Sequence, residues 1–270
     1  MNSILEGIGA RLATFLSKPI SKFEPATTNG PALLRKVIRP GDVLLVEGNS
    51  RIASAIKYLT QSTWSHAALC VGVLPGRAEP DGEPHMLVEA ELGFGVISSP
   101  LSRHDLYHTR ICRPVQLAQT DLRKVIDYAV MRIGQDYDVK NVLDLCRYLL
   151  PQPPVPMRMR RRMLALGSGE PTRSICSTLI AQAFESVQYP VLPRIEVLQE
   201  DGVSEAESRQ IKEIHHIRHH SLFTPRDFDI SPFFGVVKPT IENGFDYRRI
   251  EWAEKTPEIE DNDEARGWGS

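Results

Sequence analysis

Apolar residues recur along the chain with two periods, one typical of strands and one typical of helices. Short apolar runs bounded by turn residues predict β-strands. These runs lie at residues 43–48, 64–73, 85–90, 93–98, 109–114 and 231–238. Apolar residues three and four positions apart predict helices. They occur at residues 50–60, 119–133, 139–150 and 175–187. The pattern therefore predicts a chain that contains both kinds of element.

The pattern also divides the chain into a central domain and two flanking regions. Residues 1–36 predict an amphipathic helix in the first twenty positions, followed by a linker rich in proline and glycine. Residues 37–240 carry the apolar periodicity of a folded domain, interrupted by a polar insertion of helical composition at about 196–220. Residues 241–270 end in an acidic, glycine-containing stretch, for which we expect disorder.

Composition narrows the class of protein. The chain has 270 residues, of which 41% are hydrophobic and 24% charged, as in ordinary globular proteins. Its net charge of −2 argues against a nucleic-acid partner. We expect a cytoplasmic protein, because no apolar run would span a bilayer and no signal peptide is recognisable. The apolar face of residues 1–20 predicts either packing against the domain or another chain, or peripheral contact with a membrane.

One cysteine stands where a helix would activate it. Ser174 is suited to cap a helix, which places Cys176 in the first turn. The amide groups of a helix N-terminus favour a thiolate over a thiol. The alternative is that Cys176 is a small buried hydrophobic residue. We expect that role for the other three cysteines, which are widely separated and suit a reducing compartment: Cys70, Cys112 and Cys146.

A base and a carboxylate for such a thiol occur on two predicted strands. His66 lies near the start of the strand predicted at 64–73 and shares one face with Ala68 and Cys70. Glu89 lies between apolar residues of the next strand, and either points to solvent or is buried with a partner. Cys176 as nucleophile, His66 as base and Glu89 as the group that orients the imidazole would form a triad. His66 is alternatively a structural histidine.

Other histidines and arginines offer weaker candidates for a site. His104 and His108 lie in a polar connection and are predicted to be surface residues. The pairs 215/219 and 216/220 have the spacing of a helical metal site, but no acidic ligand accompanies them. We therefore expect no metal and no cofactor. Five arginines precede the Cys176 helix and predict either a solvated connection or an anion-attracting loop: Arg158, Arg160, Arg161, Arg162 and Arg173.

Several short motifs together resemble the permuted papain-like cysteine amidases, the YiiX-like branch of the NlpC superfamily. The matching stretches run in the family's order over roughly residues 38–240. They are Arg39–Val46, Ile56 through Ser65-His66-Ala67-Ala68 and Val71-Gly72, Val88-Glu89-Ala90, Gly134 with Tyr137-Asp138, Ile175-Cys176-Ser177 with Leu179-Ile180, and Thr224-Pro225 with Asp227-Phe228 and Ser231-Pro232.

This resemblance implies an α+β fold, with an antiparallel sheet or half-barrel against which the Cys176 helix packs. It implies that Cys176 is the nucleophile, that His66 is the base and that Glu89 orients His66. Tyr137 would lie near the cleft, to bind substrate or to pack in a turn.

The resemblance predicts a cysteine hydrolase, an amidase or peptidase that cleaves a small peptide, an amino-acid amide or a cell-wall-derived peptide through a thioacyl intermediate. Two alternatives stay open. One is a membrane-associated acyltransferase or lipid acyl-ester hydrolase that resembles lecithin:retinol acyltransferase. The other is a non-catalytic module that binds an acyl group or peptide. The sequence leaves the oligomeric state open.

Overall fold

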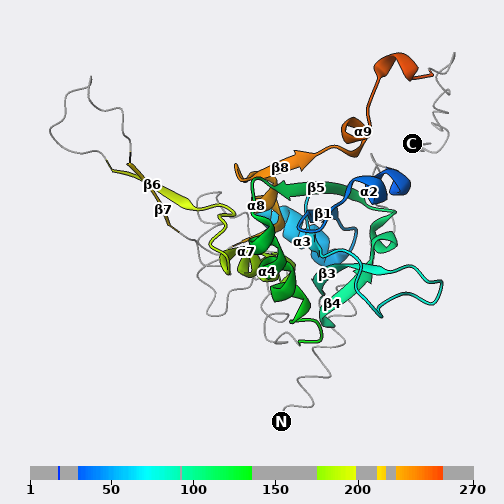
Figure 1. Cartoon of the computed structure of the whole chain (residues 1–270), viewed down its shortest axis with the longest axis horizontal. Coiled ribbons are helices and arrows are strands. Elements are labelled where there is room, and N and C mark those ends of the chain that lie inside the picture. The colour runs from blue at the N-terminus through cyan, green and yellow to red at the C-terminus, as the bar shows by residue number, and fades with distance from the viewer. Residues whose placement is uncertain are drawn as a thin grey trace, which may run out of the picture.

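An antiparallel sheet of six strands organises the computed structural model of the chain (Figure 1). The structure describes Lys18 and residues 30–91, 93–135, 175–198, 212–216 and 223–251. For Leu59, Ile175, Cys176 and the strands at 194–198 and 212–216 it describes the backbone alone. Within these ranges the fold is α+β, as predicted. Among the described helices, none has the length and apolar character needed to cross a membrane.

The sheet has the strand order β4-β3-β2-β1-β5-β8, and each neighbouring pair is antiparallel. Its strands are β1 (Val43–Glu47), β2 (His66–Cys70), β3 (His85–Glu91), β4 (Gly95–Pro100), β5 (His108–Pro114) and β8 (Phe234–Val237). The helices are α2 (Pro31–Val37), α3 (Arg51–Thr60), α4 (Gln119–Val130), α7 (Ile175–Glu185), α8 (Pro225–Asp229) and α9 (Pro239–Glu242), with 3₁₀ turns η1 (Leu101–His104) and η3 (Tyr247–Arg249).

Both faces of the sheet are covered, which explains why β1 is a continuous apolar run. Side chains alternate between the two faces of a strand. Val43 and Leu45 belong to a core that includes buried residues of α4 and α7. Leu44 and Val46 point the other way, into a second core with Leu34 of α2. A strand buried on both sides has no polar face, so alternation disappears from its sequence.

Helix α2 differs from the predicted linker over residues 21–36. Pro31 occupies the first turn of α2, where a missing N–H costs nothing. Leu34 and Val37 are buried and contribute to the core on the α2 face of the sheet. The apolar pair in this short segment therefore belongs to the folded domain. The amphipathic helix predicted over residues 1–20 lies outside the described residues, apart from Lys18.

The polar segment predicted to be helical contains two strands. β6 (Arg194–Leu198) pairs in antiparallel register with β7 (Lys212–His216), with Ile195 opposite His215. The ribbon extends away from the main sheet (Figure 1). The helical interpretation of this insertion is wrong for these residues, and so is the helical spacing assumed for His215 and His216. Polar composition did not indicate this pairing.

A buried ion pair fixes the turn that leads into β1. Gly41 has φ +91°, and a Cβ there would lie 2.4 Å from Leu122 Cδ1, so only glycine fits this turn. Asp42, which is 1% exposed, accepts two hydrogen bonds of 2.8 Å from Arg113 on β5. Its Oδ2 also accepts from the Arg39 N–H at 2.8 Å. The carboxylate thus joins the turn to the neighbouring strand.

We expect Asp42→Ala to lower the free energy of unfolding by about 2–4 kcal/mol, because it leaves Arg113 without its carboxylate. The lower end of this range is below the usual cost of breaking a buried ion pair, because Arg113 is partly exposed and water can solvate part of its charge. Urea denaturation followed by circular dichroism measures the change. Asp121→Ala is the matched control, since its partner Lys124 is exposed, and should change stability by no more than about 0.5 kcal/mol. Equal effects of both substitutions would contradict this account.

Candidate functional site

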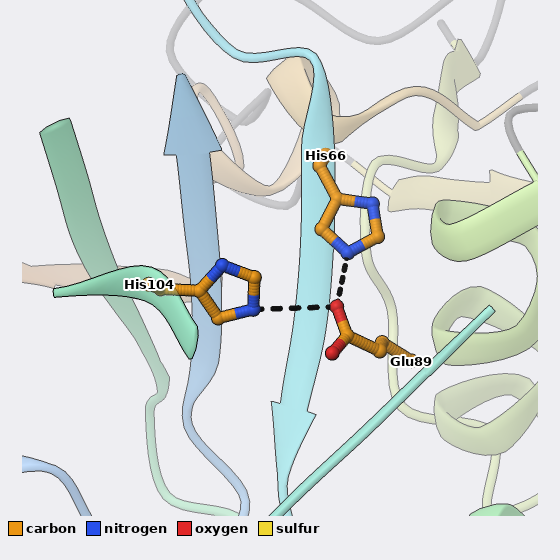
Figure 2. A group of neighbouring side chains, drawn as sticks. All are labelled: His66, Glu89 and His104. Atoms are coloured by element: carbon orange, nitrogen blue, oxygen red, sulfur yellow. Dashed lines mark hydrogen bonds and ion pairs between the residues drawn. The ribbon is translucent and has the colours of Figure 1, made fainter. Parts of the chain in front are cut away.

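The buried carboxylate of Glu89 is the centre of the candidate site. Glu89 lies in β3, opposite Ala68 of β2, and only 1% of it is exposed. A charged carboxylate in such a position needs partners for both oxygens. Ser99 on β4 donates a hydrogen bond to Oε1, and Arg103 Nε lies 3.6 Å from the same oxygen. The two imidazoles of His66 and His104 approach Oε2 (Figure 2).

His66 stands at the first residue of β2, and its Nε2 lies 2.5 Å from Glu89 Oε2. A quarter of its side chain is exposed, so the ring lies at the boundary between the core and solvent. The predicted pairing of His66 with Glu89 is present in the structure. Of the two environments considered for Glu89, the structure has the buried one. The small side chain of Ala68 leaves room for both groups on this face of the sheet.

The pKa of Glu89 is set by two opposing influences. Burial alone would raise the pKa, but the neighbouring His104 and His66 together hold it well below its usual range. Glu89 is therefore ionised near neutral pH and accepts hydrogen bonds only. It follows that the short contact between Oε2 and His66 is donated by the imidazole, from an Nε2–H group. In a neutral His66 this leaves Nδ1 as the basic nitrogen.

His104 is the member of the site that sequence reasoning missed. The prediction that it is a surface residue is wrong, because it is 5% exposed. Its Nε2 lies 3.3 Å from Glu89 Oε2. A signal for its burial exists in the spacing of Leu101 and His104, since residues three apart share a face of a 3₁₀ helix. Leu101 is buried and Tyr107 packs against the same core.

Helix α7 carries Cys176 as its second residue and packs against the strands that bear His66 and Glu89. The Cys176 side chain itself lies outside the described part of the structure. Buried residues of α7, among them Leu179 and Ile180, share a core with Ala67 and Val88. Those residues alternate with His66 and Glu89, so the sheet separates the apolar side of α7 from Glu89. A thiol in the first turn can meet His66 only around the end of β2.

The remaining predicted residues divide into buried cysteines and positions that the structure does not describe. Cys70 and Cys112 are buried free thiols, as predicted. Burial raises the pKa of Cys70 to about 11 and that of Cys112 to about 12. Positions outside the described residues are Tyr137, Cys146, the five arginines between 158 and 173, and His219 and His220. His108, predicted to be exposed, stacks on Trp64 with ring centroids 5.2 Å apart.

Comparison with solved structures gives likenesses, among them the following one. The fold is similar to the crystal structure of the metalloprotein YiiX from Escherichia coli O157:H7, with a TM-score of 0.41 and 15% sequence identity. The match covers 80% of this chain and 98% of the YiiX chain. No protein-family model matches the sequence. No curated protein matches it either.

We expect Cys70 and Cys112 to resist iodoacetamide in the folded protein at about pH 8, because the raised pKa leaves almost no thiolate at either sulfur. Peptide mass spectrometry after brief labelling should find both unmodified. Labelling in urea is the control and should modify both. Fast modification of either residue in the folded protein would show that burial does not protect it.

Proposed function

We propose that the chain is a cysteine hydrolase of permuted papain-like architecture, in which Cys176 is the nucleophile, His66 the base and Glu89 the group that orients His66. The observation that carries the proposal is the contact between His66 Nε2 and the buried carboxylate of Glu89. It supplies the base–carboxylate half of a triad on two strands against which the Cys176 helix packs. Chain order differs among triads, so His66 before Cys176 is no objection.

The tautomer of His66 supports its role as the base. Nε2 donates to Glu89, so the lone pair of the neutral ring is on Nδ1. Figure 2 shows this second nitrogen on the ring edge turned away from Glu89. A proton taken up at Nδ1 produces an imidazolium beside an ionised carboxylate, which stabilises it. The low pKa of Glu89 keeps that carboxylate charged throughout.

The helix supports the role of Cys176 as the nucleophile. The first turn of an α-helix has backbone N–H groups without intrahelical partners, and these favour a thiolate. The N–H of Cys176 is also suited to stabilise the oxyanion of a tetrahedral intermediate. The proposal requires the start of α7 to lie at the end of β2, where His66 stands, since the sheet separates the rest of α7 from Glu89.

The proposed reaction has two steps. In the first, the Cys176 thiol loses its proton to His66 Nδ1 and the sulfur attacks an amide carbonyl carbon. The C–N bond then breaks, the amine leaves with the proton from His66, and a thioester remains. In the second, water loses a proton to Nδ1 and attacks the thioester, which releases a carboxylic acid and the thiol. The substrate class is an amide of small size, such as a peptide or an amino-acid amide.

His66→Ala should lower kcat/KM on a panel of fluorogenic peptide amides by ~10²–10⁴-fold, because the base is lost. The same variant should raise the pH midpoint of iodoacetamide reaction at Cys176, which we expect below the ordinary value of about 8.5 in the wild type. His85→Ala is the matched control, since His85 contacts a different carboxylate, that of Glu79, and it should change neither quantity.

Mass spectrometry of the trapped thioacyl enzyme supplies a direct test of the nucleophile. Incubation of the full chain with a peptide amide, followed by acid quenching, should give an adduct on Cys176 that hydroxylamine removes. Cys176→Ser should lose that thioester adduct. A Cys176 that reacts with iodoacetamide at an ordinary pH midpoint, unchanged by His66→Ala, would refute the mechanism.

A further inference from the structure

Three side chains from separate elements bring potential metal ligands together at Glu89. They are His66 on β2, Glu89 on β3 and His104 on η1 (Figure 2). One ligand atom from each residue lies within 4.8 Å of the other two. Two imidazoles and one carboxylate are a donor set that divalent zinc uses in proteins. The triad described above uses only two of these residues and leaves His104 without a role.

His104 is the residue whose environment points to a ligand. Its side chain is 6% exposed. Among the described residues neither ring nitrogen has a hydrogen-bond partner. A buried polar group without a partner is destabilising. Its Nε2 is directed at Glu89 Oε2 from 3.3 Å, outside hydrogen-bond geometry, and a cation between these two groups would satisfy both.

The spacing of the three ligand atoms is close to that of a zinc site. Bonds of about 2.0–2.2 Å in a tetrahedral arrangement separate neighbouring ligand atoms by ~3.3–3.6 Å. The 3.3 Å between His104 Nε2 and Glu89 Oε2 fits this range. The 2.5 Å between His66 Nε2 and the same oxygen has to lengthen by roughly 1 Å. The ring of His66 is partly exposed and stands at the start of its strand, so a small rotation of the side chain can move Nε2 by this distance.

The other oxygen of Glu89 is held by groups that fix the carboxylate. Ser99 donates a hydrogen bond to Oε1. Carboxylates that ligate metals are commonly oriented in this way by neighbouring hydrogen bonds. Arg103 lies 3.6 Å from Oε1 and opposes a cation, but its Nη2 is 2.6 Å from Glu91 Oε2, and this second carboxylate offsets its charge.

We propose that His66, Glu89 and His104 bind one divalent transition-metal ion, with Zn²⁺ as the first candidate. The ion takes the Nε2 lone pair of His66, so the ring proton moves to Nδ1. A ring protonated at Nδ1 cannot accept the proton of a thiol. A second consequence, which rests on the proposed hydrolase function, is that metal occupancy switches off the thiol chemistry of Cys176.

Metal binding is tested on the full chain after removal of metals with EDTA. Co²⁺ titration followed by visible absorption, and Zn²⁺ titration by calorimetry, should detect one site that depends on these residues. His104→Gln removes a ligand and keeps the contact between His66 and Glu89, and should weaken binding at that site by at least ~100-fold. His66→Gln should weaken binding to the same extent. Because His66 is partly exposed, this second variant keeps the test valid if His104→Gln fails to fold.

Two controls isolate the site. His85→Gln changes a different histidine–glutamate contact, the one between His85 on β3 and Glu79. This variant should bind the metal as the wild type does. Cys176→Ser should also bind as the wild type does, because the thiol is not a ligand. Wild-type binding in both His104→Gln and His66→Gln, or no binding of Co²⁺ and Zn²⁺ by the wild type, would overturn the proposal.

The switching consequence is read from the reaction of Cys176 with iodoacetamide. Stoichiometric Zn²⁺ should slow this reaction at least tenfold in the wild type, whereas His104→Gln should need far more Zn²⁺ for the same effect. Equal sensitivity of the two proteins would overturn the switch. A Cys176 that is unreactive without metal, in a protein that binds one Zn²⁺, would count against the hydrolase and leave the metal site standing.

Discussion

A carboxylate enclosed within the sheet is the constraint on which the candidate site depends. Glu89 is 1% exposed, and a charge in that position would be destabilising by several kcal/mol, or would be neutralised, without partners. Its two oxygens are instead approached by Ser99, Arg103, His66 and His104. These groups come from three elements: His66 from β2, Ser99 from β4, and Arg103 and His104 from η1. The carboxylate of Glu89 therefore joins segments that are separate in the chain. Each segment contributes a group that compensates the negative charge of Glu89.

The strand register explains how the sheet accommodates this charge. Ala68 lies opposite Glu89, and Leu87, two residues away on the same face, lies opposite Ser99. Ala68 is too small to fill the space above the strand, so the carboxylate and both imidazoles fit there. The other face of the same strands is entirely apolar and packs against α7. One sheet thus holds a polar cluster on one side and the support of the Cys176 helix on the other.

Much of this architecture could be predicted from the sequence, and the failures have physical causes. Apolar runs located all six strands of the main sheet, because both faces of that sheet are buried. The ribbon of β6 and β7 was missed because the polar, helix-favouring composition of residues 196–220 outweighed the short alternation of Ile195 and Val197 in β6. His66 and Glu89 were recognised by their place on strands and by the family resemblance. The burial of Glu89 stayed open, since a single carboxylate between apolar residues does not show which face is covered.

His104 shows why the chemistry of the cluster needed the structure. The potential ligands near His104 in the sequence, Asp105 and His108, are not the ones that join it in the cluster, and the partner carboxylate is fifteen positions earlier on another element. Once the three residues meet, one nitrogen atom has two possible uses. His66 Nε2 either keeps its hydrogen and donates to Glu89, which makes Nδ1 basic, or gives its lone pair to a cation, which places the hydrogen on Nδ1. A neutral imidazole has a single lone pair, so both uses cannot hold at once. The occupant of the space between His66, Glu89 and His104 therefore determines whether the opposite edge of the His66 ring can act as a base.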